Sequence, residues 1–517
     1  MSGQRPLAVV HGVALVGLDP VAVRVEATCS PGLPVLRLVG LPDAAVREAG
    51  DRVRTAVQRH GLRWPGERVV VNLAPAELPK VGTSFDLPLA LAVLVATGQV
   101  PAAALTDTWA VGELGLDGSV RPVAGLLPLV AGARQLGATR LLVPAAGAGE
   151  AALVAGIELV PVADLGETVA VLRDGRSPSL VVPVPIAPAP PRPDLADVRG
   201  QPIARRAVEL AAAGGHHLLL TGPPGCGKTL LAERLHGLLP PLSTDEALEV
   251  AAVHALAGER RAGDPLTLAP PLRAPHRLVS AAALLGGGSG VPRPGELSLA
   301  HRGVLLLDEL LETPRAVLDA LRQPLERGEV VLARSRARVR YPAATLLVAT
   351  TNPCPCGRSG DPRHTCRCRP DQVVRYRSRL SGPLLDRLDV QVALRPLDRD
   401  TLVTARPGEP SAPVAQRVLA ARQVAAERWA PAPGVPAGCS VVLNRDAPVP
   451  LLRRTATARA VAALGAVLEA RGASARAFDR ALRLARTIAD LEGVERIEPV
   501  HVEEAAAYRL PPVSDAA

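Results

Sequence analysis

The sequence predicts an α/β protein in three parts: an α+β domain, a three-layer domain built on a parallel sheet, and a helical region at the end. A glycine-rich loop, Gly222 to Thr229, follows one short apolar run and precedes a helical pattern. Two further apolar runs, Val304 to Leu307 and Thr345 to Ala349, are short and lead into polar residues, as buried parallel strands do. From about residue 399 the pattern is helical. A chain of 517 residues exceeds one hydrophobic core, so several domains are expected.

Composition narrows the class of protein. Hydrophobic residues make up 48% of the chain but aromatic residues only 2%, so the cores must be built from Ala, Val and Leu. The net charge of +9 favours a polyanionic partner such as nucleic acid. The apolar N-terminal residues are interrupted by His11, Gly17 and Asp19, which argues against a signal peptide or a membrane span. We therefore expect a cytoplasmic protein.

Residues 1–173 are expected to form the α+β domain, because strand-like and helical patterns mix there without a cofactor fingerprint. The strand-like runs are Val9–Val16, Ala22–Thr28, Val35–Val39, Val69–Asn72 and Thr139–Val143. The helical runs are Ala44–His60, Leu87–Ala96 and Leu127–Gln135. Residues 174–193 are dense in proline, which disfavours helices and sheet ladders, so they predict a semi-rigid linker at a domain boundary.

The second domain is expected to span residues 194–398, with a helix over Ala204–Ala213 that leads into the strand before the glycine-rich loop. Residues 399–517 predict a helical lid, broken at Ala430–Gly438 where Pro and Gly are dense. Its helical runs are Pro413–Trp429, Thr455–Ala470, Ala475–Leu491 and Val500–Tyr508.

The loop from Gly222 to Thr229 has the sequence GPPGCGKT and the spacing of a P-loop. Its backbone N–H groups must turn inward around phosphate oxygens, which requires glycine where a side chain would block the approach. Lys228 is predicted to bind the β- and γ-phosphates of ATP, and Thr229 to hold Mg²⁺. The other nucleotide-binding positions are Gly222, Pro223, Pro224, Gly225, Cys226 and Gly227.

Two carboxylates, Asp308 and Glu309, directly follow the apolar run Val304 to Leu307. This is the Walker B arrangement, in which the end of a strand brings the first acid beside the metal ion and leaves the second facing the γ-phosphate. Asp308 is predicted to hold Mg²⁺, and Glu309 to orient or deprotonate the attacking water. The P-loop and the acidic pair together predict ATP hydrolysis.

The segment from Gly328 to Tyr341 predicts a β-hairpin with arginine at every second position. On a strand this spacing places all four side chains on one face, where they are suited to DNA phosphates. The alternative is a solvated edge strand that is protected by its charge. The predicted DNA-binding residues are Arg334, Arg336, Arg338 and Arg340.

Four of the seven cysteines form two C-x-C pairs separated by nine residues. Two close thiolate pairs can complete a tetrahedral shell, which favours structural Zn²⁺; an iron–sulfur cluster or reduced free thiols are the alternatives. His364 between the pairs is expected to be a loop residue rather than a ligand. The predicted ligands are Cys354, Cys356, Cys366 and Cys368.

Several stretches resemble the YifB/ComM family of bacterial magnesium-chelatase-like AAA+ proteins. They are NLAPAELPK from Asn72, GGHHLLLTGPPGCGKT from Gly214, PRPGELSLAH from Pro292, TNPCPCG from Thr351, RLSGPLLDRLD from Arg379 and ARTIADLEG from Ala485. One departure is Leu310-Leu-Glu-Thr, which replaces the proline and aromatic residue usual after Walker B. The departure leaves both Walker B carboxylates in place.

The resemblance implies roles for further residues of the nucleotide site. Asn352 would be sensor 1, which hydrogen-bonds the γ-phosphate or the attacking water. Arg387 would be an arginine finger that enters the neighbouring subunit's site, a role that requires a ring. Arg476 would be sensor 2, with Arg480 as the second choice.

The resemblance also implies a Lon-protease-like fold, related to ribosomal S5 domain 2, for residues 1–173. Ser84 falls near the position of the Lon nucleophile. A serine needs a base to take its proton, and the stretch Val123 to Pro128, which would supply the Lon lysine, contains no lysine. An inactive scaffold that packs on the ATPase is therefore expected, rather than a peptidase.

For function, the resemblance implies a hexameric, ATP-driven DNA motor of the helicase type, associated with branch migration of recombination intermediates during DNA uptake. The alternative is a chelatase-like ATPase that remodels a protein or tetrapyrrole partner. The basic hairpin favours DNA, single-stranded or branched, as the partner. The expected cofactors are ATP, Mg²⁺ and structural Zn²⁺, and no membrane is expected to be involved.

Overall fold

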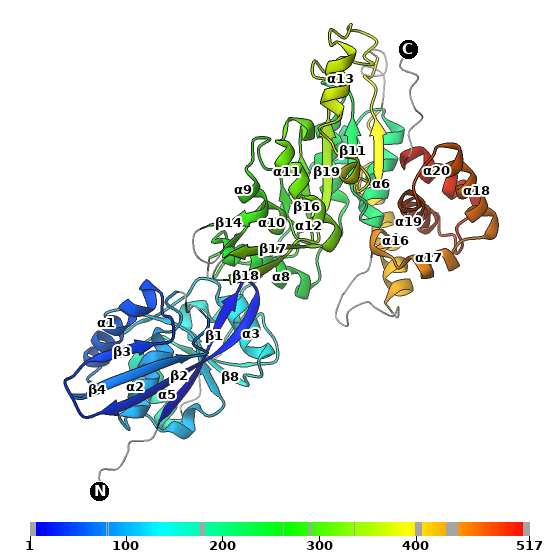
Figure 1. Ribbon diagram of the computed structural model, residues 1–517. Coiled ribbons are helices and arrows are strands. Elements are labelled where there is room, and N and C mark those ends of the chain that lie inside the picture. The colour runs from blue at the N-terminus through cyan, green and yellow to red at the C-terminus, as the bar shows by residue number, and fades with distance from the viewer. Residues whose placement is uncertain are drawn as a thin grey trace.

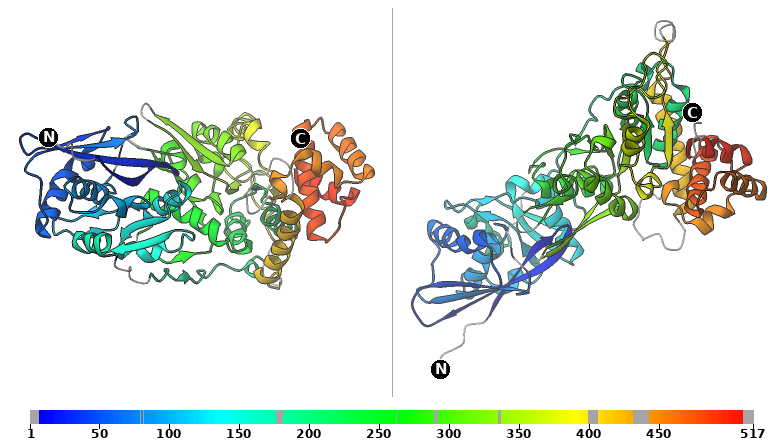
Figure 2. Two further views of the ribbon diagram at one scale, coloured as in Figure 1. Left: turned by 90° about the horizontal axis from the view of Figure 1, so that it is seen from below. Right: turned by 45° about the horizontal axis from the view of Figure 1, so that its top comes forward.

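The computed structural model describes residues 7–78, 80, 82–175, 181–261, 263–288, 292–334, 337–398, 406–430 and 443–509. The chain forms an elongated α/β molecule in which an N-terminal body, a central body and a group of C-terminal helices follow one another (Figures 1 and 2). In the described part of the chain, no helix is both long and apolar enough to cross a membrane.

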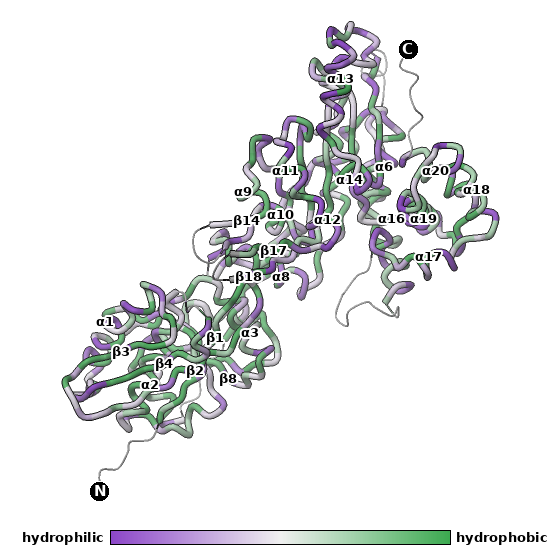
Figure 3. Tube along the Cα trace, in the orientation of Figure 1, coloured by the Kyte–Doolittle hydropathy of each residue, from purple (hydrophilic) through white to green (hydrophobic). Residues whose placement is uncertain are grey.

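A seven-stranded mixed sheet forms the N-terminal body, in the order β3-β4-β2-β1-β5-β8-β9. Its strands are β1 (Ala8–Val16), β2 (Asp19–Ser30), β3 (Leu36–Val39), β4 (Arg68–Ala74), β5 (Thr108–Ala110), β8 (Arg140–Pro144) and β9 (Glu158–Val162). Its main helices are α1 (Ala44–Arg59), α2 (Asp86–Ala96), α3 (Leu126–Gln135) and α5 (Leu165–Asp174). Apolar residues follow the strands of this sheet (Figure 3), and every residue of α2 is buried. Sequence patterns predicted five of these strands but missed β5, β9 and α5.

A five-stranded parallel sheet forms the centre of the molecule, in the order β13-β16-β19-β11-β20. Its strands are β11 (Leu218–Thr221), β13 (Leu272–Arg273), β16 (Val304–Leu307), β19 (Leu346–Thr351) and β20 (Val390–Ala393). The helices around it include α6 (Pro202–Gly214), α7 (Lys228–Leu235), α8 (Thr244–Ala257), α11 (Arg315–Ala320), α12 (Arg322–Arg327) and α13 (Pro370–Arg377). Every residue of β16 and β19 is buried, which explains their continuous apolar runs. Because the strands are parallel, the segments that follow them meet at one edge of the sheet.

The C-terminal helices share one apolar core with the parallel sheet and α6. They are α16 (Ser411–Trp429), α17 (Val449–Arg454), α18 (Ala458–Ala470), α19 (Ala475–Leu491) and α20 (Pro499–Arg509). The predicted helical runs agree with α16, α18, α19 and α20 to within a few residues, and α17 was missed. The predicted break at Ala430–Gly438 falls almost entirely outside the described residues.

Two connections join the N-terminal body to the centre. Helix α8 packs on α3, and apolar residues of both helices belong to the same core. In the proline-rich segment, β10 (Ile186–Ala187) pairs with β12 (Leu266–Thr267), and the N–H of Val184 donates to the carbonyl oxygen of Gly149 at 2.9 Å. The described part of this segment is extended, as expected, but it lies against both bodies and is not a free spacer.

Candidate nucleotide site

The P-loop connects β11 to α7 at the carboxyl edge of the parallel sheet. Gly225 and Gly227 have positive φ angles of 76° and 91°, a backbone conformation that residues with a side chain adopt only with strain. The glycines therefore allow the tight turn that brings Lys228 to the first turn of α7. At a helix start, unpaired N–H groups favour anions such as phosphate.

Lys228 joins the P-loop to the end of β19. Its side chain is buried, and Nζ donates to the carbonyl oxygens of Gly222 (2.7 Å) and Pro223 (2.9 Å) and to Oδ1 of Asn352 (3.1 Å). Burial lowers the pKa of Lys228 from its ordinary value. An ammonium group held by neutral oxygens is suited to exchange these partners for phosphate oxygens, which carry negative charge.

Thr229 and Asp308 supply oxygen atoms for a divalent metal. The hydroxyl of Thr229 lies 3.2 and 3.3 Å from the two carboxylate oxygens of Asp308. Thr350 on β19 also donates its hydroxyl to Asp308, and its oxygen accepts the backbone N–H of Glu309 at 3.1 Å. Hydroxyl and carboxylate oxygens are the donors that Mg²⁺ prefers, so these residues fit the ion that the fold implies.

Glu309 is paired with Arg277, a residue that the sequence did not single out as part of the site. Nη1 of Arg277 lies 2.5 Å from Oε2 of Glu309. Arg277 follows β13, which is the neighbour of β16 in the sheet, so both residues emerge at the same edge. The available signal was a basic residue shortly after an edge strand, but β13 has only two residues and is too short to recognise from periodicity.

Arg387 and Arg476 are not joined to this cluster. Arg387 donates Nη1 to the carbonyl oxygen of Pro383 at 2.6 Å, and Nη2 pairs with Glu326 on α12. Arg476 is exposed in the first turn of α19. Within the described residues, neither arginine has a hydrogen bond or ion pair with Lys228, Asp308 or Glu309. Arg480, the second choice for sensor 2, is bonded to Asp389 and is considered below.

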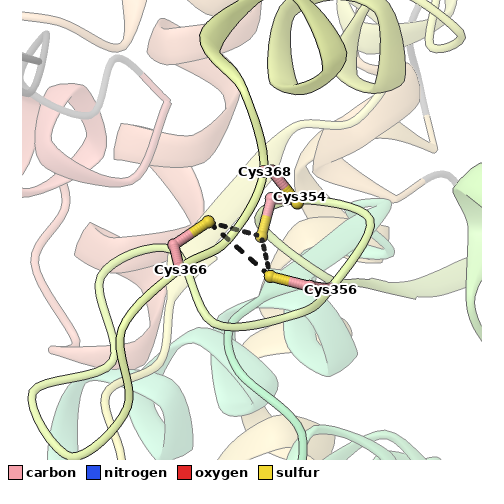
Figure 4. A group of neighbouring side chains, drawn as sticks. All are labelled: Cys354, Cys356, Cys366 and Cys368. Carbon is pink, nitrogen blue, oxygen red and sulfur yellow. Dashed lines mark hydrogen bonds between the residues drawn. The ribbon is translucent and has the colours of Figure 1, made fainter.

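The four cysteines converge on one point beside the P-loop (Figure 4). Sγ of Cys354 lies 3.5 Å from that of Cys356 and 3.6 Å from that of Cys366, and all four Sγ atoms lie within 4.8 Å of one another. These separations exceed a disulfide bond of about 2 Å and approach the edge of about 3.8 Å of a tetrahedron with Zn–S bonds of about 2.3 Å. Backbone hydrogen bonds lower the pKa of Cys356 to about 6, which favours its thiolate, whereas desolvation and the neighbouring thiols raise the pKa of Cys366 and of Cys368 despite a backbone hydrogen bond to each.

The thiol geometry therefore fits zinc, and two neighbouring contacts define its surroundings. His364 is not among the side chains that converge on this point, which are the four cysteines; its Nδ1 lies 2.8 Å from a carboxylate oxygen of Asp361. The cysteine loop also lies against the P-loop: a Cβ atom at Gly357 would lie 2.7 Å from Cδ of Pro224. The loop that carries the cysteines is thus in direct contact with the phosphate-binding loop at Gly357 and Pro224.

The basic hairpin consists of β17 (Glu329–Arg334) and β18 (Ala337–Pro342), as the sequence predicted. Its register pairs Ala333 with Arg338 and Arg334 with Ala337. Position 334 therefore belongs to the face of the hairpin opposite to that of positions 338 and 340. The expectation that all four arginines lie on one face is wrong. The physical reason is that directly paired residues of an antiparallel hairpin share a face, so the register of the two strands decides the face of each position, which a count of every second residue along the chain ignores.

Arg338 and Arg340 remain as neighbours on one face of β18. Arg338 is exposed, and Arg340 is 60% exposed and lies 3.7 Å from Asp19 at the tip of the β1–β2 hairpin. Arg336 and the side chain of Arg334 lie outside the described residues. The described hairpin thus carries two exposed, adjacent cations, one of which faces the N-terminal body.

In the N-terminal body, Ser84 is buried just before α2. Leu126 and Leu127, from the stretch where a Lon lysine was sought, are buried at the start of α3. Apolar side chains at these positions cannot serve as a base for Ser84.

Comparison with known proteins places the three parts in one family. Residues 25–147 match the family described as subunit ChlI of Mg-chelatase, residues 194–402 match magnesium chelatase, subunit ChlI, and residues 408–509 match the C-terminal region of that subunit. Shorter similarities extend to Lon protease 2 of Bacillus subtilis (30% identity over 26% of each chain) and to the magnesium-chelatase 67 kDa subunit of Chlorobaculum parvum (27% identity over 30% of this chain and 23% of that one).

Full-length relatives are more similar. An uncharacterized protein of Mycobacterium tuberculosis is 48% identical over 96% of each chain, and the uncharacterized protein YifB of Escherichia coli is 41% identical over 97% of each. Competence protein ComM of Haemophilus influenzae is 40% identical, again over 97% of each chain. This protein therefore belongs to the YifB/ComM family of magnesium-chelatase-like AAA+ proteins.

Proposed function

We propose that this protein is an ATPase whose hydrolysis drives movement on DNA. The observation that carries the ATPase part is the meeting of Lys228, Thr229, Asp308, Glu309 and Asn352 at one edge of the parallel sheet. Lys228 would bind the β- and γ-phosphates, and Thr229 and Asp308 would hold Mg²⁺, which would neutralise phosphate charge. Glu309 would orient or deprotonate water, and Asn352 would fix the γ-phosphate or that water.

Hydrolysis is proposed to require a ring of subunits, in this case a hexamer. Arg387 contacts Pro383 and Glu326 rather than the nucleotide-site residues of its own subunit. It is proposed to act as an arginine finger in the neighbouring subunit's site. Arg476 is proposed as sensor 2, because it lies exposed at the first turn of α19. The C-terminal helices would then form the lid, and ring assembly would complete each site.

DNA is the proposed partner, in single-stranded or branched form. The support is twofold: the relative in H. influenzae is named a competence protein, and β18 presents Arg338 and exposed Arg340 side by side. Guanidinium groups bind backbone phosphates and in that contact carry no base specificity. The proposed activity is branch migration of recombination intermediates during DNA uptake, with residues 1–173 as an inactive Lon-like scaffold.

A structural zinc ion is proposed for the cysteine cluster. When bound, zinc would cross-link the loop that follows Asn352 and contacts Pro224. A closed shell of four thiolates leaves no open position for catalysis, so the role proposed is to stiffen this side of the nucleotide site.

A second candidate function is remodelling of a protein or tetrapyrrole partner. It is favoured by the match of the central and C-terminal regions to the magnesium chelatase subunit ChlI. In that case the exposed arginines of β18 would be a solvated edge rather than a DNA contact.

One experiment separates the two candidates. ATP hydrolysis and strand exchange are measured with forked, four-way and single-stranded DNA, with Glu309→Gln as the inactive control. We expect at least one DNA to raise the rate of hydrolysis and to be remodelled only by the wild type. Stimulation by a porphyrin or a protein partner, with no response to any DNA, would replace the motor by the second candidate.

A further inference from the structure

Asp389 lies two residues after Arg387, directly before β20, and is almost completely buried. Its Oδ1 accepts Nη1 of Arg480 at 2.8 Å, and Nη1 of Arg509 lies 4.0 Å away. Its Oδ2 accepts the backbone N–H of His217, the residue before the P-loop strand, at 3.3 Å. Burial acts to raise the pKa of Asp389, but the neighbouring His216 and Arg480 outweigh it and lower the pKa well below its ordinary value. The side chain is therefore a carboxylate in the folded protein.

The same two arginines also hold the backbone around Arg387. Arg480 on α19 donates to the carbonyl oxygen of Arg387 at 3.1 Å. Arg509, at the end of α20, donates to the carbonyl oxygens of Leu388 (2.8 Å) and Asp386 (2.7 Å). Three consecutive carbonyl groups and the buried carboxylate are thus bound by guanidinium groups that come from the C-terminal helices.

This arrangement restricts the segment that carries Arg387. Arg509 is 5% exposed, and a buried guanidinium that lost its acceptors would be left unsatisfied at a high cost in free energy. The backbone of residues 386–388 therefore moves only together with α19 and α20. The side chain of Arg387 is held differently: it is 13% exposed, its Nη1 donates to the carbonyl oxygen of Pro383 at 2.6 Å, and its Nη2 pairs with Glu326, whose side chain is 60% exposed. The backbone is bound by buried groups of the C-terminal helices, whereas the partner of Nη2 lies at the surface, where an acceptor is exchanged at lower cost.

We propose that Arg480 and Arg509 are positioning residues: they hold the backbone of Arg387 so that its guanidinium reaches the phosphates bound by the adjacent subunit. The inference rests on the proposed role of Arg387 as an arginine finger. It assigns to the C-terminal helices a task in the neighbour's site, and it separates Arg480 from the sensor 2 role, in which a residue acts on the nucleotide of its own subunit. A displacement of a catalytic group by about 1 Å can cost on the order of 100-fold in rate.

Mixed rings test the proposal. In the ring, each site combines the P-loop and Walker B residues of one subunit with the Arg387 of the next. Subunits carrying Glu309→Gln lack the Walker B glutamate but keep Arg387 in position. Subunits carrying Arg480→Ala keep the P-loop and Walker B residues but have a misplaced Arg387. In a random equal mixture, about a quarter of the sites should pair the two intact halves, so the mixture should hydrolyse ATP faster than the average of the two separate proteins.

The expected results are specific to positioning. Arg480→Ala should lower kcat by at least about tenfold without weakening the binding of a fluorescent ATP analogue, which also shows that the variant is folded. Arg480→Lys, which keeps the charge beside Asp389, should recover part of the rate. Arg387→Ala/Arg480→Ala should be no slower than Arg387→Ala alone, because the second change acts only through the first.

Arg387→Ala mixed with Glu309→Gln is the reference. If this pair regains activity and Arg480→Ala with Glu309→Gln does not, Arg480 acts in its own subunit and the positioning role is overturned while the finger stands. If the reference pair itself stays inactive, Arg387 is not a finger and the inference falls with the proposed role. A double variant that loses rate additively would also overturn the proposal.

Discussion

Arg277 provides a direct test of how the water-activating carboxylate is controlled. The structure shows its guanidinium 2.5 Å from the carboxylate of Glu309. A carboxylate held in this pair is less available to orient water, so the pair should slow hydrolysis until it opens. Arg277→Ala removes the pair and leaves the bond from Lys228 to Asn352 and the contact between Thr229 and Asp308 in place.

The size of the effect on hydrolysis follows from the solvent exposure of the two paired side chains. The side chains of Arg277 and Glu309 are 52% and 39% exposed, so solvent screens the pair. Exposed ion pairs are worth about 0.2–1 kcal/mol, which changes the population of unpaired Glu309 by about 1.4- to 5-fold at room temperature. We expect Arg277→Ala to raise the rate of ATP hydrolysis in the absence of DNA by about the same factor.

Phosphate release at saturating ATP measures this change. Arg277→Lys is the matched control, because it keeps the positive charge and should stay close to the wild-type rate. Glu309→Gln gives the background. A loss of about tenfold or more in Arg277→Ala would mean that Arg277 stabilises the transition state, and the reasoning from the resting pair would be refuted.

Three further predictions concern stability, metal content and DNA affinity. His217 is fully buried, and burial lowers its pKa to about 3, below the ordinary value of about 6.5. Below about pH 6.5 the unfolded chain binds a proton that the folded protein does not, so the free energy of unfolding should fall by up to about 1.4 kcal/mol per pH unit. His217→Asn cannot titrate and should flatten the pH dependence of the urea midpoint; an unchanged slope would contradict the assignment. Cys354→Ser should abolish the stoichiometric zinc of the purified protein, whereas the control Cys29→Ser, at a buried position of β2, should not. A wild-type protein free of zinc, or a Cys354→Ser variant that retains it, would count against the site. Arg338→Gln and Arg340→Gln should each lower the slope of log affinity for duplex DNA against log salt by about 0.9, while Arg54→Gln on α1 leaves it unchanged; equal slopes in all three variants would contradict a hairpin contact.

The parallel sheet and most of its site could be predicted because the relevant signals are local. Buried parallel strands appear as apolar runs, and the residues that follow them are brought together by the common direction of the strands. Asp308 and Asn352 each directly follow such a run, so their approach to the P-loop follows from the sheet alone. Lys228 was recognised from the glycine spacing for the same reason.

Features that depend on tertiary pairing could not be predicted. The partner of Glu309 comes from Arg277, which follows a strand of two residues without a readable pattern. Which arginines of the hairpin share a face depends on the register of its two strands, which the spacing of residues along the chain does not reveal. The proline-rich segment has no ladder signal of its own, yet Ile186 and Ala187 pair with β12, a strand about 80 residues further along the chain. Asp389 likewise becomes important only through arginines that lie far along the chain.

The most direct test of the central claim is the rate of ATP hydrolysis measured with and without four-way DNA, in the wild type and in the double variant Arg338→Gln/Arg340→Gln. We predict that DNA raises the rate of the wild type several-fold, and that the double variant keeps the basal rate but loses the stimulation. A wild-type rate that DNA leaves unchanged, or a double variant stimulated as strongly as the wild type, would contradict a DNA-driven ATPase.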